Sequence, residues 1–385
     1  MKELKAIISA YEKIDTSRQK AALATVVKVR GSSYRSPGAR MLITDDGKWV
    51  GSISGGCLEG DALRKARQVM TDKKPMTITY DTREESNQNL GIGLGCNGVI
   101  DVLIEPIYHD AETISLIQKI VTQNEPVALA TRVRGEFAGE KFLLDHRLQP
   151  QFKFSDNTLN PLVLQELTEV FNHHRSETKT ILGEEIFIEL IQPVVSLIIF
   201  GGGFDARPVS TLAKSLGWDV QVTDECVSHI APIFFPTADK LSLCQREFID
   251  RDFVVTPYTA CVLMSHNYEY DRDVLKKLLK TTTPYIGILG PRKRFDKMLS
   301  GFEKQHIALS TEDFQRIHSP IGLDIGAETP DEIALSILAE IQSKFANRSG
   351  GFLKYRSGPI HERKGDQVFK QVYLNNDTPT KSVNG

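Results

Sequence analysis

Two single cysteines stand among glycines near the start of the chain. The stretch "SISGGCLEG" (52–60) places Cys57 after Gly55 and Gly56, and "GLGCNG" (93–98) places Cys96 after Gly95. Thiolate sulfur is a soft ligand that suits molybdenum–sulfur chemistry, Zn²⁺, Cu⁺ or a persulfide. Zinc is disfavoured, because neither a C-x-x-C pair nor a close histidine pair is present to complete a four-ligand site. The structural alternative is that both are small buried hydrophobic residues on ordinary turns.

The residues around Cys57 also favour an anion. Hydrophobic residues recur at helical spacing from Leu58 onward, so Cys57 is predicted at a helix N-terminus. Unpaired amides and the helix dipole there favour a thiolate and attract anions. The turn "GSSYRSPGAR" (31–40) adds Arg35 and Arg40 as candidate ligands of a phosphate or carboxylate. If the loops of Cys57 and Cys96 converge, they form an anion-binding pocket in which these two thiols are the candidate metal ligands.

A glycine fingerprint opens the second half of the chain. "LIIFGGGFDARPVSTLAKSLGWDVQVTD" (197–224) predicts a strand, the turn Gly201-x-Gly203-x-x-Ala206, a helix, a second strand and Asp224. In dinucleotide-binding folds the glycines allow the tight turn and the approach of a pyrophosphate, and the acid bonds a ribose hydroxyl. The fold can persist while the pocket binds something else or nothing.

Two further stretches are predicted at the carboxyl ends of strands, where such sheets bind ligands. "MSHNYEYD" (264–271) offers His266, and "GPRKR" (290–294) offers Arg292 to an anion. A hydrogen-bonded structural histidine and a solvated helix start are the alternative interpretations of the two stretches.

The pattern of elements predicts an α+β domain over residues 1–192 and a Rossmann-like, doubly wound α/β domain over residues 193–346. A polar tail or arm over 347–385 follows. Asp46-Gly47 predicts a hairpin turn, and "NHHRSETKT" (172–180) is taken as a polar surface stretch. The stretch 125–145 weakly echoes 20–46, which suggests related strand pairs but is too loose to prove a repeat.

Composition excludes several classes of protein. The chain has 385 residues, a formal net charge of −2 and no long basic run, so nucleic acid is not expected as a partner. Charges interrupt the apolar residues at the N-terminus, so a signal peptide is not expected there. The longest apolar run, "VVSLIIF", is far too short to cross a bilayer. Five sparse cysteines do not form a disulfide framework. We therefore expect a cytoplasmic protein with reduced thiols and no membrane insertion; a homodimer is the commonest assembly.

Five stretches in order resemble the XdhC/CoxI family of xanthine dehydrogenase accessory proteins: 31–60, 93–106, 265–279, 284–294 and 321–341. The resemblance implies a maturation factor that binds molybdenum cofactor (molybdopterin), assists its sulfuration and passes it to an apo xanthine dehydrogenase or related molybdenum hydroxylase. It also implies that Cys57, and secondarily Cys96, contacts the cofactor, and that the protein is a chaperone more than an enzyme. A cysteine desulfurase is a further candidate partner. Phe204 and Cys226 stand where many relatives carry histidine and arginine.

Two other functions remain open at this point. The glycine fingerprint and Asp224 also fit an NAD(P)-dependent oxidoreductase, for which His266 is the candidate acid–base residue. A docking subunit with vestigial pockets is the third possibility. In the leading interpretation the Rossmann-like domain holds a nucleotide, such as that of a dinucleotide form of the cofactor.

Overall fold

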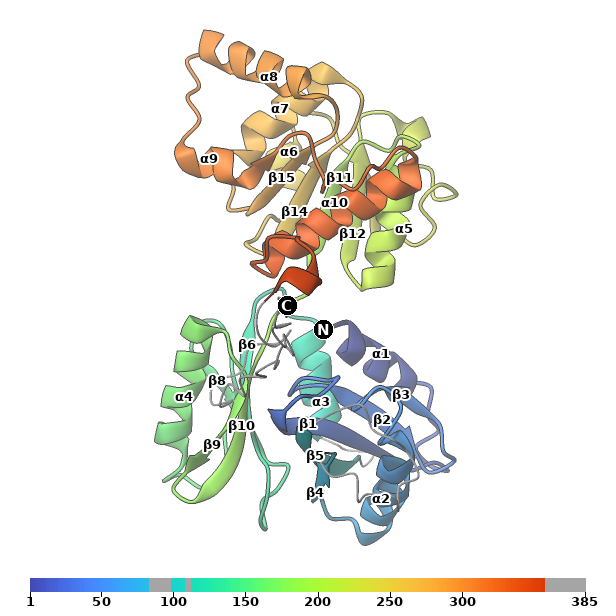
Figure 1. Cartoon of the computed structure of the whole chain (residues 1–385), viewed down its shortest axis with the longest axis vertical. Coiled ribbons are helices and arrows are strands. Elements are labelled where there is room, and N and C mark those ends of the chain that lie inside the picture. The colour runs from blue at the N-terminus through green and yellow to red at the C-terminus, as the bar shows by residue number, and fades with distance from the viewer. Residues whose placement is uncertain (83–97, 108–111, 357–385) are drawn as a thin grey trace, which may run out of the picture.

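The computed structural model describes residues 1–82, 98–107 and 112–356. Two antiparallel sheets lie below a third, parallel sheet in Figure 1. Residues 1–191 build the antiparallel pair, and the parallel sheet begins at Ser196. The short segment 192–195 joins the two parts of the chain.

The first antiparallel sheet has the strand order β3-β2-β1-β5-β4. Its hairpin turns at Gly47, whose φ is 91° and whose amide donates to the Thr44 carbonyl over 3.0 Å, as Asp46-Gly47 predicted. Helix α2 packs on one face through residues at helical spacing, Ala62, Ala66 and Val69. The elements of this half are α1 (Lys2–Tyr11), β1 (Ala21–Gly31), β2 (Arg40–Thr44), β3 (Trp49–Gly51), α2 (Glu59–Asp72), β4 (Met76–Asp81) and β5 (Gly98–Ile107).

The second antiparallel sheet repeats the first. Its order is β8-β7-β6-β10-β9, which is the same order of strands counted from the start of each half. Its elements are α3 (Glu112–Val121), β6 (Val127–Arg132), β7 (Lys141–Leu144), β8 (Pro150–Phe152), α4 (Asn160–His173), β9 (Glu177–Ile181) and β10 (Glu184–Ile191). The weak sequence echo is therefore one part of a complete structural repeat. Most of the stretch taken as polar surface is the end of α4 and the edge strand β9, which is polar because it lies at the edge of its sheet.

The two halves pack against each other through reciprocal contacts. Arg40 of the first half forms a buried ion pair with Glu189 of the second, and Lys141 of the second forms one with Glu105 of the first. Arg40 also donates to the Gly38 carbonyl over 2.9 Å, and Lys141 donates to the Gly139 carbonyl over 2.8 Å. Such exchanged contacts are those of a two-fold interface between like surfaces.

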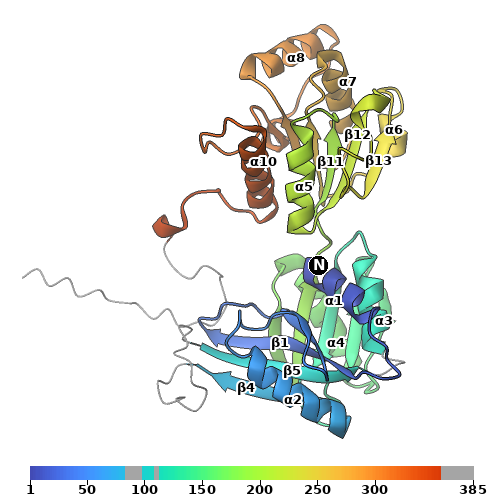
Figure 2. The ribbon, with the colours of Figure 1, turned by 90° about the vertical axis from the view of Figure 1, so that its right-hand side faces the viewer.

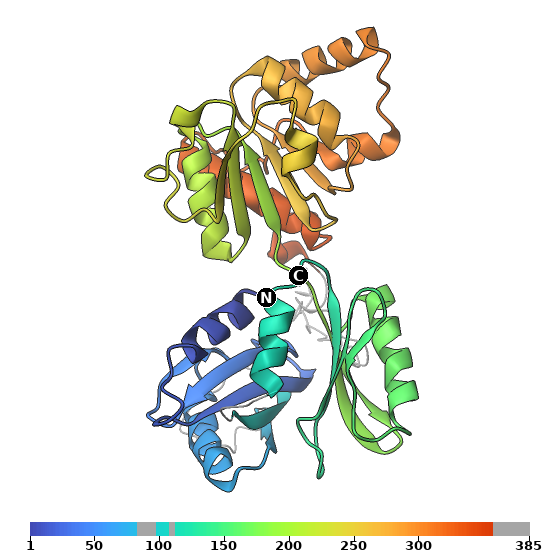
Figure 3. The same cartoon turned by 180° about the vertical axis from the view of Figure 1, so that it is seen from behind.

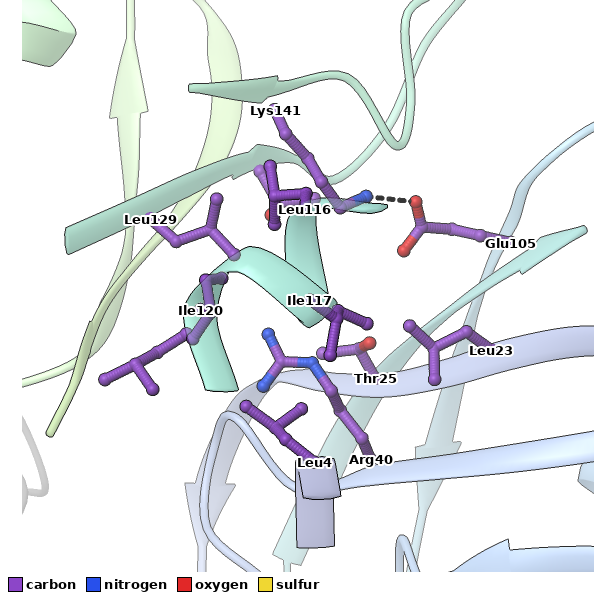
Figure 4. A pocket seen from close by; sticks show the side chains of 12 residues that line it. Leu4, Leu23, Thr25, Arg40, Glu105, Leu116, Ile117, Ile120, Leu129 and Lys141 are labelled. Carbon is purple, nitrogen blue, oxygen red and sulfur yellow. Dashed lines mark hydrogen bonds and ion pairs between the residues drawn. The ribbon is translucent and has the colours of Figure 1, made fainter. Parts of the chain in front are cut away.

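The core between the halves is tightly filled. Figure 4 shows Lys141 and Glu105 beside Leu23, Leu129 and side chains of α3. The space among these side chains is about 10 Å³, no more than one water molecule needs. Helix α2 covers the outer face of the first sheet and α4 that of the second, as seen in Figure 3. This interior is structural, so a ligand has to bind elsewhere.

The parallel sheet has the order β13-β12-β11-β14-β15-β16, with every neighbouring pair parallel. Helices α5 and α10 pack on one face, and α7 and α8 on the other, so the predicted doubly wound fold is confirmed (Figure 2). The strands are β11 (Ser196–Phe200), β12 (Asp219–Asp224), β13 (Lys240–Leu243), β14 (Thr259–Leu263), β15 (Tyr285–Ile288) and β16 (Ile317–His318). The helices are α5 (Ala206–Leu216), η2 (Val227–His229), α6 (Ile249–Asp252), α7 (Tyr268–Leu278), α8 (Arg292–Lys304), α9 (Thr311–Arg316), α10 (Pro330–Phe345) and η3 (Leu353–Tyr355).

Helix α1 also contacts the parallel-sheet domain. Lys5 Nζ lies 2.7 Å from Asp219 Oδ1, and the Lys2 ammonium donates to the Ser215 carbonyl. In the described part of the chain, no helix is both long and apolar enough to cross a membrane.

Candidate cofactor-binding site

Cys57 lies on the connection between β3 and α2, directly before Leu58, the N-cap residue of α2. Its side chain is neither buried nor fully exposed. Gly55 and Gly56 before it have φ angles of 88° and 124°, a conformation that other residues rarely adopt. The predicted position at a helix start is therefore correct, and the thiol stands on a backbone that requires glycine.

The carboxylate of Glu59 organises this loop. It accepts hydrogen bonds from the Ser52 hydroxyl over 2.7 Å and from five backbone amides, those of Ile53, Ser54, Gly55, Gly56 and Leu58. Burial alone would raise the pKa of Glu59, but the hydrogen bonds from Ser54, Ser52 and the loop amides outweigh it and lower the pKa to about 2. These five amides are therefore not available to an anion. They belong to the loop and to the N-cap residue, so the expectation of free donors in the first turn of α2 stays a prediction.

The second half of the repeat contains the equivalent connection, residues 153–159, between β8 and α4. Thr158 occupies the position of Cys57, and Asp156 and Asn157 those of the two glycines. The Asp156 carboxylate accepts from the amide and the hydroxyl of Thr158 over 2.9 and 2.7 Å. The same connection is thus built without a thiol or a glycine pair, so the fold itself does not require Cys57.

The segment 31–38, between β1 and β2, contacts both the Cys57 loop and the start of β5. A side chain at Gly55 would come within 2.7 Å of the Tyr34 ring, and one at Gly98 within 2.3 Å of the Ser32 carbonyl oxygen. Gly55 and Gly98 therefore contact two nearby residues of one segment. Cys96 and Gly95 lie outside the described residues, so their convergence with Cys57 stays a prediction.

The two arginines predicted for an anion are both paired within the protein. Arg40 is 5% exposed and is held by Glu189, so we correct its assignment from ligand to structural residue. The Arg35 guanidinium pairs with Glu3, which also accepts from the Arg40 amide over 2.6 Å. Arg35 is partly buried, and its charge is committed to α1 rather than to the Cys57 loop.

In the parallel-sheet domain, the glycine turn meets the loop after β14. The order of the strands reverses between β11 and β14, which is where open α/β sheets bind ligands. Gly201 has a φ of 122°, and a side chain there would lie 2.4 Å from the Ser265 backbone. A side chain at Gly203 would contact the His266 ring at 3.5 Å. His266 Nε2 lies 3.2 Å from Asp205 Oδ2, so the predicted Gly201, Gly203 and His266 do lie together.

A buried carboxylate holds the loop that presents His266. Asp271, 1% exposed, accepts from the Ser265 hydroxyl over 2.6 Å and pairs with Arg294 over 2.7 Å. Burial raises the pKa of Asp271, and the bonds from Ser265 and Arg294 oppose that rise. The Asn267 side chain caps α7. The residues before and after His266 in the chain, Ser265 and Asn267, are therefore both held by hydrogen bonds.

Asp224 contacts the glycine turn from inside the protein, and Arg292 lies one strand away from it. Asp224 is 4% exposed, and its carboxylate accepts from the amides of Gly202 and Cys226, each over 2.8 Å, and contacts His229 Nδ1 at 3.2 Å. Its predicted contact with a ribose hydroxyl is therefore not supported. Arg292 begins α8 after β15, one strand beyond β14, and is exposed.

Sequence reasoning missed two carboxylates. Glu59 and Asp205 hold the Cys57 loop and His266, respectively. The Ser-rich stretch followed by an acid at a helix start is a capping signal that could have indicated Glu59. Within the described residues, no group of three or more His, Cys, Asp and Glu side chains could hold a metal ion. The assignment of Cys57 and Cys96 as metal ligands therefore stays a prediction.

Comparison with known proteins places both parts of the chain. Residues 15–81 match the model of the XdhC and CoxI family, and residues 197–341 match the XdhC Rossmann domain. A Bacillus subtilis protein, described as a probable xanthine dehydrogenase subunit, is 31% identical over 84% of this chain and 93% of its own. The molybdenum cofactor insertion chaperone PaoD of Escherichia coli is 26% identical over 84% of this chain and 83% of its own. A crystal structure of a xanthine dehydrogenase from Bacillus halodurans has a TM-score of 0.73 at 31% identity, covering 89% of this chain and 96% of that one.

Proposed function

Because the chain belongs to the XdhC and CoxI family, we propose that it is a maturation factor for a molybdenum hydroxylase of the xanthine dehydrogenase type. In this role it binds molybdenum cofactor at the Cys57 loop, assists its sulfuration and passes it to the apo-enzyme. A cysteine desulfurase is the class of partner that would supply the sulfur.

The observation that carries this proposal is the thiol itself. Cys57 is partly exposed on a glycine loop that Glu59 holds in place, while the equivalent loop of the second half needs neither the thiol nor the glycines. A thiolate is a soft ligand of the kind that molybdenum–sulfur chemistry favours. Open space lies beside Gly56, whereas the Tyr34 ring fills the space beside Gly55, so the approach to the sulfur is proposed on the Gly56 side. Cys96 with Gly95 is the proposed second contact.

Two observations in the parallel-sheet domain weigh against the oxidoreductase alternative. A dinucleotide-binding site of the usual kind needs an acid free to bond the ribose, and the Asp224 carboxylate is occupied by its own chain. His266 faces Asp205 beside the glycine turn, but that pair alone identifies no hydride-transfer reaction. We therefore retain a bound nucleotide only as part of the carrier proposal.

The test is cofactor loading. The full chain is purified from cells with and without cofactor biosynthesis, and bound molybdenum and pterin are measured for wild type, Cys57→Ala and Cys226→Ala. Cys226 is a matched control, because it is the other partly exposed thiol of the described residues. We expect loading in wild type and Cys226→Ala and its loss in Cys57→Ala. Equal and negligible loading in all three would overturn the proposal.

A further inference from the structure

Arg207, in the parallel-sheet domain, has no acidic partner among the residues that the structure describes. Four arginines in the described part of the chain have a buried Nε without a hydrogen bond: Arg35, Arg132, Arg207 and Arg294. Three of the four pair with a carboxylate through the rest of the guanidinium, namely with Glu3, Glu140 and Asp271. Arg207 has neither an ion pair nor a side-chain hydrogen bond with any described residue.

Two aromatic rings hold the Arg207 guanidinium instead. Its Cζ atom lies 3.8 Å from the centroid of the Phe234 ring and 5.3 Å from that of Phe204. Contacts of this kind stabilise a cation and fix the plane of the guanidinium. The N–H groups at its edge are left as donors, in the forked arrangement that binds phosphate or carboxylate with two hydrogen bonds.

The stability of the helix does not explain this cation. Arg207 is the second residue of α5, at the positive end of the helix dipole, where a positive charge is unfavourable. Asp205, the nearest acid in the chain, lies against His266. An oxyanion from outside the protein would neutralise the charge and use the free donors.

The surroundings suggest what carries that oxyanion. Phe204 directly follows Gly203 and is 67% exposed, so its ring can stack on a flat group of a ligand. Both Phe204 and Arg207 follow the carboxyl end of β11, at the position where the strand order reverses.

We propose that Arg207 binds the phosphate of a ring-bearing phosphate ester whose ring stacks on Phe204. The anion contact thus lies at Arg207, and the fingerprint acid Asp224 takes no part. The identity of the natural ligand rests on the proposed function, whereas the phosphate site itself rests on the contacts of Arg207.

The test measures ligand binding by calorimetry and by the shift of the thermal midpoint, using the full chain. Pyrophosphate and ADP are expected to bind wild type and raise its midpoint, and adenosine to do neither. Citrate separates a phosphate site from a general carboxylate site: binding of citrate alone would overturn the assignment to phosphate.

The variants locate the site. Arg207→Gln is expected to weaken ADP binding about tenfold or more, because a charged hydrogen-bonded pair is lost. Arg292→Gln, the matched control on the same edge of the sheet, should change it by less than about twofold. Phe204→Ala should weaken ADP but not pyrophosphate. If Arg207→Gln fails to fold, Arg207→Lys, which keeps the charge but loses the fork, should weaken binding several-fold.

The inference is overturned if wild type shows no saturable binding of ADP or pyrophosphate, or if Arg207→Gln binds ADP as wild type does. Cofactor loading at Cys57 is measured separately, so failure here leaves the proposed function standing, and loss of loading leaves this site standing.

Discussion

The two halves of residues 1–191 share one strand order but differ in their connections. In the second half a two-residue turn, Leu182-Gly183, joins the last two strands, whereas in the first half residues 82–97 do so. Strand β1 (Ala21–Gly31) is also longer than its counterpart β6 (Val127–Arg132). The end of β1 lies where the described parts of β4 and β5 meet it, with Gly31 paired to Gly98 and Asp81 to Val99.

This difference separates what the fold requires from what has been added to it. The second half shows that helix, strands and connections form with Asp, Asn and Thr in the 153–159 loop. The glycine pair, the thiol and the buried Glu59 occur in the first half alone. Features common to both halves should therefore affect stability equally. The thiol of the first half should affect cofactor binding, and Glu59, which holds its loop, should affect stability in the first half alone.

The largest expected effect concerns the reciprocal ion pairs. Glu189→Gln and Glu105→Gln each leave a buried cation without its partner, so each should lower the free energy of unfolding by about 3–5 kcal/mol. Urea unfolding of the two variants measures this. Values that differ by more than about 2 kcal/mol would show that the two positions are not equivalent.

The second-largest effect concerns Glu59 and distinguishes the Cys57 loop from its counterpart, residues 153–159. The folded-state pKa of Glu59 is lowered from 4.5 to about 2, so its charge stabilises the fold fully above pH 4.5, and this contribution is lost as the pH falls toward 2. Glu59→Gln should lower the free energy of unfolding at pH 7 by about 2–3 kcal/mol. The stabilities of wild type and variant should converge as the pH falls, and a constant difference would contradict the assignment.

The counterpart of Glu59 in the second half is Asn160. Its side chain bonds the backbone of Phe154, over 3.1 and 3.0 Å, and no other backbone group of the described residues. Asn160→Ala should therefore cost only about 1 kcal/mol, with no dependence on acid pH. A cost equal to that of Glu59→Gln, measured in the same unfolding experiment, would mean that the two loops are held alike.

The smallest effect concerns the outer grooves of the two halves. Lys119 donates to Gln151 over 2.6 Å across the groove between α3 and β8, whereas the equivalent groove beside α1 is lined by Val50 and Trp49. Gln151→Val should change the free energy of unfolding by less than about 0.5 kcal/mol, because the pair is exposed. A larger loss in thermal or urea unfolding would show that the bridge stabilises the second half.

Local patterns predicted the parts of the structure that depend on neighbours in sequence. The glycine fingerprint and alternating strands predicted the parallel sheet, and the spacing from Leu58 predicted α2. The repeat was only partly predicted, because the edge strand β9 is polar and resembles a loop in sequence. The two halves have diverged too far for their sequences to align clearly.

Long-range contacts determine which of the predicted residues are free to bind a ligand, and a local sequence pattern does not reveal such contacts. Arg40 looked available for an anion because its partner, Glu189, is 149 positions away in the chain. Asp224 looked like a ribose ligand because the sequence does not show that the turn after β12 folds back onto it. Cys57 was predicted at a helix start, but the weak sequence echo did not reach the 153–159 loop. Only the structure shows this loop to be the counterpart of the Cys57 loop, and so shows that the fold does not need the thiol.

A cofactor role for Cys57 is tested most sharply by the molybdenum content per chain of Cys57→Thr, which places the residue of the second half in the first. We expect the content to fall to background while the free energy of unfolding changes by less than about 1 kcal/mol. Thr158→Cys, the reverse exchange, should add no molybdenum. A folded Cys57→Thr protein that retains the wild-type molybdenum content would contradict a role for this thiol in holding the cofactor.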